Sequence, residues 1–204
     1  LAEYRPGAEG PVTVENAVTQ PLDKSSFTVL SWNVGYCGLG EESDFFMDGG
    51  KEVRPDSKEL VVKNLAGIEG FLAGRDPDFT LLQEVDSGSK RSYQVDEAAS
   101  MQGKLSRPSA YALNFSANYV PFPVPTIGKV RSGLLTFSRY GIREATRISL
   151  PSPFSWPVSV VNLKRCLLVT RIPVAGSDKE LVLVNLHLEA YDDGEGKLAQ
   201  SKQL

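Results

Sequence analysis

The sequence of 204 residues is poor in cysteine and histidine. It contains two cysteines, Cys37 and Cys166, and a single histidine, His187. Two thiols are too few for a disulfide framework or a cysteine-based zinc site. We expect the cysteines to be independent small residues of the core or of loops, although one disulfide would form if the fold brought them together. The cysteine count therefore leaves the redox compartment open.

Long hydrophobic runs and an excess of positive charge are also missing. No stretch approaches the roughly 18 apolar residues of a membrane span, and none has the layout of a signal peptide, so we expect the chain as given to be soluble. The 22 Lys and Arg residues against 25 Asp and Glu residues give a formal net charge of −3. Strong non-specific binding to nucleic acid is therefore not expected. Length and composition predict one globular domain with a sizeable core.

Segments rich in β-branched, aromatic and aliphatic residues predict five strands. These are residues 27–35, 79–85, 132–140, 166–174 and 180–188. The last two are joined by the short segment "AGSDK" and predict a hairpin, whereas "PFPVPTIG" (121–128) predicts a proline-rich loop. Residues 1–26, with three prolines, predict an extended lead-in, and we expect one domain over residues 27–204.

One long helix is predicted between the first two strands. The apolar residues that share one helical face are Val61, Leu65, Ile68 and Leu72. They indicate a helix from Asp56 to Ala73, with Asp56 and Glu59 as a capping box and Gly74 at the end. Strand, helix and strand in this order predict a βαβ unit with parallel strands.

Two shorter helical patterns follow later in the chain. "DEAASMQGKL" (96–105) predicts a short helix, and "GEGKLAQSKQL" (194–204) predicts the beginning of another. No glycine, asparagine or other cap follows the second pattern before the chain stops. We therefore expect the sequence to break off within a domain.

Alternation along the last predicted strand suggests which of its faces is buried. Side chains of a strand point to opposite faces in turn. The even positions Val182, Val184, Leu186 and Leu188 are all apolar and predict the core face. The odd positions begin apolar but end in Asn185 and His187.

Three predicted strands end in a polar side chain, namely Asn33, Glu84 and His187. Open α/β sheets bind ligands beyond the carboxyl ends of their strands, so we expect these residues to converge. Carboxylate and carbonyl oxygens suit magnesium, manganese or calcium, and a histidine beside such a cation could hold or protonate a phosphoryl oxygen. Each residue alone is more often structural, so the pattern by itself supports a site and a structural role about equally.

Four stretches, in this order, resemble the endonuclease/exonuclease/phosphatase superfamily: "SWNVG", "LLQEVD", "SGLLTFSRY" and "VNLHL". This group of metal-dependent phosphoesterases includes deoxyribonucleases, abasic-site endonucleases, neutral sphingomyelinases and inositol polyphosphate 5-phosphatases. "DFFMDGGK" and "KRSYQVD" resemble an uncharacterised bacterial branch. The resemblance implies an α/β fold, a layered sandwich of mixed β-sheets flanked by helices, with its C-terminal part missing.

The resemblance also implies roles for the three strand-end residues. Glu84, together with Asn33, would hold a catalytic Mg²⁺ (or Mn²⁺ or Ca²⁺), and Asn33 would contact the metal-bound phosphate. His187 would hydrogen-bond the scissile phosphate, as in the deoxyribonuclease and sphingomyelinase branches, and it argues mildly against the abasic-site branch. The implied reaction is cation-assisted attack of water on the phosphorus of a phosphate ester.

Further phosphate contacts are expected from cationic and amide side chains. The candidates are Arg91, Asn118, Lys164 and Arg165. The stretch "LKR" that holds Lys164 and Arg165 also fits a solvated turn. Arg139 is expected to form a structural ion pair rather than to contact substrate.

The sequence departs from the family pattern in its last part. It contains no Gly-Asp-x-Asn motif and no Asp-His pair, because His187 is its only histidine. We therefore expect a fragment or one piece of a split domain, inactive on its own, with exposed apolar surface and a complementing C-terminal fragment as partner. "LAEYRP" also resembles the juncture after a removed anchor, which suggests an extracytoplasmic or membrane-tethered parent protein.

Two other functions stay open at this point. The chain could be a non-catalytic module that binds a phosphate-bearing ligand on the same fold. A plain structural protein is the weakest alternative, because it makes the polar strand ends a coincidence. The sequence does not decide between nucleic acid, lipid and sugar phosphate, or between diester and monoester.

Overall fold

In the computed structural model, the described residues are 3–40, 50–51, 53–152, 159, 163–188 and 194–204. Part of the family-like stretch "DFFMDGGK" therefore lies outside them. Within them, nine strands form two sheets. The four-stranded sheet has the order β1 (Glu9–Pro11), β7 (Glu144–Ser149), β8 (Cys166–Pro173), β9 (Glu180–Leu186). The five-stranded sheet has the order β2 (Val14–Glu15), β5 (Ser109–Val120), β6 (Gly128–Ser138), β4 (Phe79–Asp86), β3 (Val29–Asn33).

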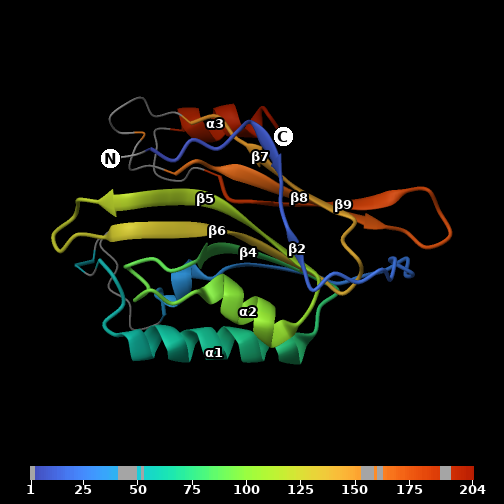
Figure 1. The fold of residues 1–204 in the computed structure, drawn as a ribbon, viewed down its shortest axis with the longest axis horizontal. Coiled ribbons are helices and arrows are strands. Elements are labelled where there is room, and N and C mark those ends of the chain that lie inside the picture. Colours follow the sequence, from blue (N-terminus) through green and yellow to red (C-terminus); the bar gives the residue numbers. More distant parts are fainter. Residues whose placement is uncertain (1–2, 41–49, 52, 153–158, 160–162, 189–193) are drawn as a thin grey trace.

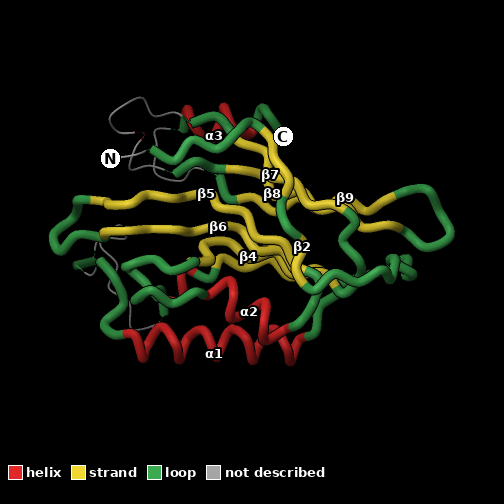
Figure 2. The backbone as a smooth tube through the Cα atoms, in the orientation of Figure 1, coloured by secondary structure: helices red, strands yellow, loops and turns green. Residues whose placement is uncertain are grey.

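The two sheets face each other, and helices lie outside them (Figure 1). Helices α1 (Lys58–Arg75) and α2 (Glu97–Leu105) cover the outer face of the five-stranded sheet, and α3 (Glu195–Ser201) lies beside the four-stranded one. Figure 2 shows the same layers, with loops gathered at the two ends of the strands. The predicted layered α/β sandwich with mixed sheets is confirmed.

The core is divided between two apolar layers. Between the sheets, a cluster includes Phe79 and Leu81 of the five-stranded sheet and Leu168 of the four-stranded one. On the helix side, a second cluster includes Leu82 and Met101. The helix-side cluster also contains every residue of the predicted helical face.

The predicted βαβ unit and hairpin are confirmed. Strands β3 and β4 pair in parallel, with Asn33 opposite Gln83, and α1 connects them. Strands β8 and β9 pair antiparallel as consecutive strands. The short helix predicted at 96–105 corresponds to α2, and the last helical pattern corresponds to α3.

The predicted ends of α1 were wrong. The N-cap is Ser57, whose hydroxyl accepts a hydrogen bond from the backbone N–H of Leu60 at 3.1 Å, so Asp56 lies outside the helix. At the other end the helix continues through Gly74 to Arg75. It stops at Asp76, which takes a left-handed conformation with φ of 49°.

The predicted core face of β9 was also wrong. Val182 and Val184 expose 44% and 39% of their surface, whereas Leu183 and Asn185 expose 9% and 1%. Leu183 belongs to the cluster between the sheets. The odd positions therefore face the core, and a buried amide occupies a place where an apolar residue was expected.

Four strands escaped the prediction, namely β1, β2, β5 and β7. In strand β5, alanine, serine and asparagine separate the residues that favour strands, so the local pattern is weak, and the long pairing with β6 stabilises the strand. The N-terminal segment is extended, as expected, and supplies β1 and β2 to the two sheets.

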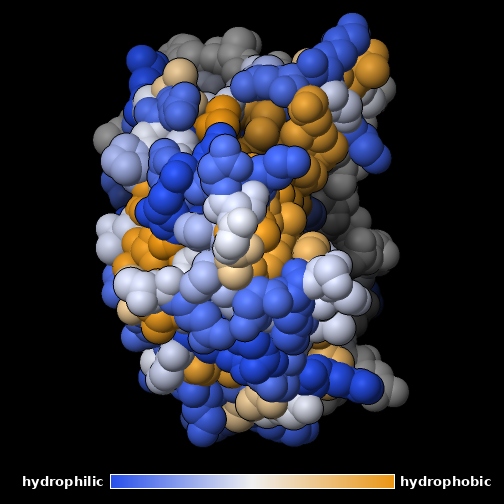
Figure 3. Space-filling view, turned by 90° about the vertical axis from the view of Figure 1, so that its right-hand side faces the viewer, coloured by the Kyte–Doolittle hydropathy of each residue, from blue (hydrophilic) through white to orange (hydrophobic). Residues whose placement is uncertain are grey.

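The thiols, the surface and the helices each bear on an expectation from the sequence. Cys37 and Cys166 are buried free thiols, so the alternative of a disulfide is excluded. Hydrophobic residues gather in the middle of the side shown in Figure 3, between hydrophilic regions. Of the helices in the described part, none is long and apolar enough to cross a membrane.

Candidate functional site

A β-bulge in β4 positions Glu84. Leu82 pairs with Leu135 and Val85 pairs with Gly133, so β4 has one residue more than β6 between these two pairs. Glu84 lies in this interval and takes a left-handed conformation with φ of 56°. Bulges of this kind redirect a side chain, and non-glycine residues with positive φ are uncommon. The carboxylate consequently points toward the neighbouring strand ends of β3 and β9.

The structure brings the three predicted strand-end residues together. Asn33 Nδ2 donates a hydrogen bond to Glu84 Oε1 at 3.0 Å, and His187 Nε2 lies 3.1 Å from the same oxygen. Asn33 Oδ1 in turn accepts a hydrogen bond from the backbone N–H of Gly35 at 3.0 Å. Among the described residues, the contacts of the carboxylate therefore all fall on Oε1, and the side chain is 26% exposed.

The surroundings of Glu84 keep it ionised. Burial alone would raise its pKa, but the hydrogen bonds from His187 and Asn33, helped by the charge of Arg91, lower the pKa to about 2. The side chain is still 26% exposed. A negatively charged oxygen is thus accessible at the end of the sheet over the whole neutral pH range.

An ion pair between Asp86 and Arg91 lies next to the site. Asp86 accepts hydrogen bonds from Arg91 Nε at 3.0 Å and from its terminal nitrogen Nη2 at 2.9 Å. The guanidinium lies 3.9 Å from the centre of the Tyr36 ring. Arg91 was predicted as a phosphate contact. Two of its donors serve Asp86, and its charge acts on Glu84 from this fixed position.

The other predicted phosphate contacts differ in their surroundings, and Arg165 lies just before β8, whose Leu167 pairs with Leu186 next to His187. Asn118 is an exposed residue of β5. Lys164 forms an ion pair with Glu3 at 2.8 Å, and Arg165 is buried. None of the three has a described contact with Asn33, Glu84 or His187. Arg139 pairs with Asp76 and Asp78, which confirms its predicted structural role.

Two buried amides that the sequence prediction did not select join the sheets beneath the site. Gln83 Nε2 donates to Asn185 Oδ1 at 2.8 Å. Asn185 Nδ2 donates to the backbone oxygen of Leu82 at 3.0 Å, next to the bulge. This pair, the Gln83–Asn185 clamp, fixes the strand that leads to His187 against the strand that carries Glu84. A signal was present, since Asn185 interrupts an apolar run and Gln83 precedes Glu84.

A cavity of about 580 Å³ adjoins the site on the α1 side. Its lining includes Asn33 and Trp32 of β3, and Lys63 and Asn64 of α1. Asn64 donates a hydrogen bond to the backbone oxygen of Cys37 at 3.0 Å, which holds the segment after β3 against α1. A pocket of this volume matches the size of small-molecule sites.

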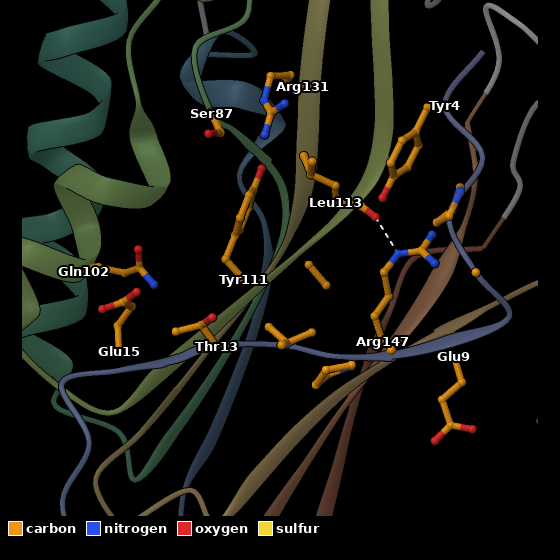
Figure 4. A pocket seen from close by; sticks show the side chains of 16 residues that line it. Tyr4, Glu9, Thr13, Glu15, Ser87, Gln102, Tyr111, Leu113, Arg131 and Arg147 are labelled. Atoms are coloured by element: carbon orange, nitrogen blue, oxygen red, sulfur yellow. Dashed lines mark hydrogen bonds between the residues drawn. The ribbon is translucent and has the colours of Figure 1, made fainter. Parts of the chain in front are cut away.

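A second cavity, of about 490 Å³, lies on the opposite edge of the five-stranded sheet (Figure 4). The N-terminal segment and β5 supply most of its lining. Arg147 lines it and donates to the backbone oxygen of Leu113 at 2.8 Å. None of the three strand-end residues lines it, so it is separate from the candidate site.

The site contains few groups that could ligate a metal. Within the described residues, no group of three or more His, Cys, Asp and Glu side chains could hold a metal ion. Magnesium needs fewer protein ligands, because it usually keeps several waters and binds one or two carboxylates together with substrate phosphates. Glu84, ionised and partly exposed, fits that mode. It does not fit a closed zinc site.

Comparisons with known proteins identify the fold. No family model matches the chain, and no curated protein matches it. Among solved structures, an endonuclease/exonuclease/phosphatase from Beutenbergia cavernae DSM 12333 aligns with a TM-score of 0.60 at 18% identity, over 87% of this chain and 42% of that one. A family protein from Leptotrichia buccalis C-1013-b has a TM-score of 0.54 at 13% identity, over 87% and 61%.

A third similar structure is ANGEL2, described as a 2',3'-cyclic phosphatase. It aligns with a TM-score of 0.55 at 16% identity, over 94% of this chain and 48% of that one. The chain thus spans between about two fifths and three fifths of the length of these structures. At such identities the similarity establishes the endonuclease/exonuclease/phosphatase fold.

Proposed function

We propose that this chain, which has the fold of the endonuclease/exonuclease/phosphatase proteins, belongs to a metal-dependent hydrolase of phosphate esters. The observation that carries the proposal is the meeting of Asn33, Glu84 and His187 at the ends of three strands, with Glu84 held ionised. Similar structures include a 2',3'-cyclic phosphatase, which supports chemistry at phosphorus.

Glu84 would hold a Mg²⁺, Mn²⁺ or Ca²⁺ ion through Oε2. Asn33 Oδ1, which already accepts a hydrogen bond from Gly35, would be a second oxygen ligand through its other lone pair. Such a cation, when bound, stabilises the negative charge that develops on the phosphoryl and leaving oxygens. The side chains supply the remaining functions. Asn33 orients the Glu84 carboxylate through the 3.0 Å hydrogen bond, and the fixed charge of Arg91 favours anionic ligands.

His187 would bind a non-bridging phosphoryl oxygen. Its Nε2–H reaches Glu84 Oε1 in the structure, and a phosphate that arrives at the cation site offers an alternative acceptor for the same donor. The imidazole is 23% exposed, so a ligand can reach it. Asn118, Lys164 and Arg165 remain candidates for contacts with remote parts of a larger substrate.

The proposal includes a partner segment that completes the domain. Strands β3 and β9 each lie at an end of their sheet within the described residues, and Val29 and Val182 are exposed on them. A complementing C-terminal fragment could pair with these edges and supply the further acidic and histidine groups that the reaction requires. The isolated chain is then nearly inactive. An extracytoplasmic or membrane-tethered parent protein belongs to the same proposal.

The first test separates cation binding from turnover. Isothermal titration with Mg²⁺ and Mn²⁺ should give weak binding to the wild-type chain and none to Glu84→Gln. Glu180→Gln, which removes a carboxylate from the β8–β9 hairpin, is the matched control and should bind like the wild type. Equal binding by Glu84→Gln and wild type would contradict the cation site.

The second test concerns the reaction. Hydrolysis of bis(4-nitrophenyl) phosphate should depend on Mg²⁺, stay slow in the isolated chain, and fall to background in Glu84→Gln and His187→Ala.

The scarcity of metal-ligating groups in the described part favours a second candidate, a non-catalytic module that binds a phosphate-bearing ligand. Cation and phosphate binding without any hydrolysis in the full-length protein would establish that alternative.

A further inference from the structure

The hairpin formed by β5 and β6 extends past the end of the sheet that carries the candidate site. Asp86, the last residue of β4, pairs with Ser132, whereas β6 begins at Gly128. At about 3.3 Å per residue, the hairpin reaches on the order of 13 Å beyond β4 before its loop begins, and the segment that follows β4 lies beside this stretch as far as the hydrogen bond from Lys90 to Lys129. Figure 1 shows it projecting at one end of the molecule, opposite the turn between β8 and β9.

The tip of this hairpin exposes large apolar side chains. Val124 is 90% exposed, Phe122 59% and Tyr119 43%. Scattered apolar residues are common on protein surfaces, but here three lie within six residues. Phe122 and Val124 alternate with prolines 121, 123 and 125, and Tyr119 lies near the end of β5. Because proline restricts the backbone, the loop presents them without a large cost in conformational entropy.

The base of the hairpin is ordered by its own small core. Ala117, Val120 and Val130 are buried in a cluster separate from the two main ones. The apolar residues of the hairpin therefore divide into an inward set that stabilises it and an outward set at the tip. The apolar side chains at the tip are therefore exposed on an ordered hairpin.

Two exposed lysines lie side by side near the loop of the hairpin. Lys90 and Lys129 are both exposed and adjacent, since the backbone N–H of Lys90 donates to the backbone oxygen of Lys129 at 2.7 Å. Neither ammonium group has an ion pair within the described residues. The chain has no acidic residue between Glu97 and Glu144, although its net charge is −3. An apolar tip above exposed cations matches an anionic lipid surface, with acyl chains below charged headgroups.

We propose that the β5–β6 hairpin docks the protein on membranes that contain anionic lipids, with Phe122 and Val124 in the acyl region and Lys90 and Lys129 at the headgroups. The docking does not depend on catalysis. If the proposed phosphoesterase function holds as well, the site at Glu84 faces the same surface, and its substrate is a phosphate ester of a lipid. A nucleic acid fits less well, because its backbone offers no apolar partner for the tip.

Sedimentation with vesicles tests the docking. The wild-type chain should bind vesicles of phosphatidylcholine with phosphatidylserine, and bind vesicles of phosphatidylcholine alone far less. Lys90→Gln and Lys129→Gln should each lower the partition coefficient roughly fivefold, which corresponds to about 1 kcal/mol per charge. Phe122→Ser combined with Val124→Ser should lower it on the order of tenfold or more. All four positions are exposed, so circular dichroism should show the native fold.

Matched controls lie at the opposite end of the molecule. Val182→Ser and Lys179→Glu remove an exposed apolar residue and an exposed cation there, and should leave vesicle binding unchanged. Glu84→Gln should also bind vesicles like the wild type, which separates this inference from the catalytic one. Equal binding by the hairpin variants and the wild type would overturn the docking. So would equal binding to both vesicle types, or binding to a single-stranded oligonucleotide but not to vesicles.

Discussion

Replacement of Asn185 by alanine should destabilise the fold and disturb the site together. The amide is 1% exposed and donates to the backbone oxygens of Leu82 and Leu135 at 3.0 and 3.3 Å, while accepting from Gln83 at 2.8 Å. Each such bond contributes about 1 kcal/mol, so we expect a loss of about 3 kcal/mol. For a chain of this length that corresponds to a decrease in Tm of roughly 6–12 °C.

Thermal unfolding followed by circular dichroism measures this effect. Asn118→Ala is the control, because it removes the same side chain from an exposed strand position and should change stability by less than about 0.5 kcal/mol. The unfolding free energies of Asn185→Ala, Gln83→Ala and the double variant should be non-additive, since the two side chains are in contact.

The single histidine gives a second readout. His187 contributes the only imidazole resonances of the chain, and their chemical shifts depend on its contact with Glu84. We expect them to move in Asn185→Ala and to stay in place in Asn118→Ala. If Asn185→Ala unfolds at the same temperature as Asn118→Ala, the clamp has no energetic role. If it is destabilised but the imidazole resonances do not move, the clamp does not position His187.

Three further predictions concern the framework. Ser57→Ala should lower the free energy of unfolding by about 1 kcal/mol, because it removes the N-cap of α1, whereas Asp56→Ala should hardly change it. Urea unfolding of both variants decides which residue caps the helix. Asp78 is buried, which would raise its pKa, but the N–H of Thr28 and the ammonium of Lys24 hold the pKa well below its usual range. Its ionised form therefore stabilises the fold above about pH 4, and this advantage over Asp78→Asn should shrink as the pH falls further; an undiminished difference at pH 2 would contradict it. Burial raises the pKa of Glu97, so the folded state favours its protonated form, and the free energy of unfolding of the wild type should rise relative to that of Glu97→Gln as the pH falls toward the ordinary carboxyl range. A pH-independent difference in urea unfolding would contradict this.

Local patterns predicted those parts of the fold that depend on neighbouring residues. The spacing of the apolar residues located α1, because a helix in contact with a sheet must bury one face. The ends of α1 were mistaken because Asp56 and Ser57 are adjacent residues that both favour capping, and the backbone geometry selected Ser57. Strand β5 was missed because alanine, serine and asparagine interrupt its aromatic residues, and its long-range pairing with β6 does not appear in the local sequence.

The candidate site was predictable for the same kind of reason. Asn33 ends β3, Glu84 lies two residues before the end of β4 and His187 directly follows β9, and the topology of the sheets brings these strand ends together. Asn185 stands out within an apolar run, but its pairing with Gln83 was not predictable, because the two residues are 102 positions apart. The bulge at Glu84 was also hidden, since no glycine or asparagine marks it in "FTLLQEVD".

The bulge at Glu84 changes which face of the sheet the odd and even residues of β4 point to. Leu81 packs between the sheets and Leu82 packs toward the helices, as alternation requires, yet Val85 packs toward the helices as well. The residue inserted between Leu82 and Val85 has thus exchanged odd and even positions for the rest of the strand. Deleting Glu84 would therefore place Val85 directly after Gln83, in a position that simple alternation assigns to the helix side. It would restore simple alternation without turning Val85 or Asp86 to another face, so the residue that the strand could lose without changing the rest of its packing is the one that carries the carboxylate of the site.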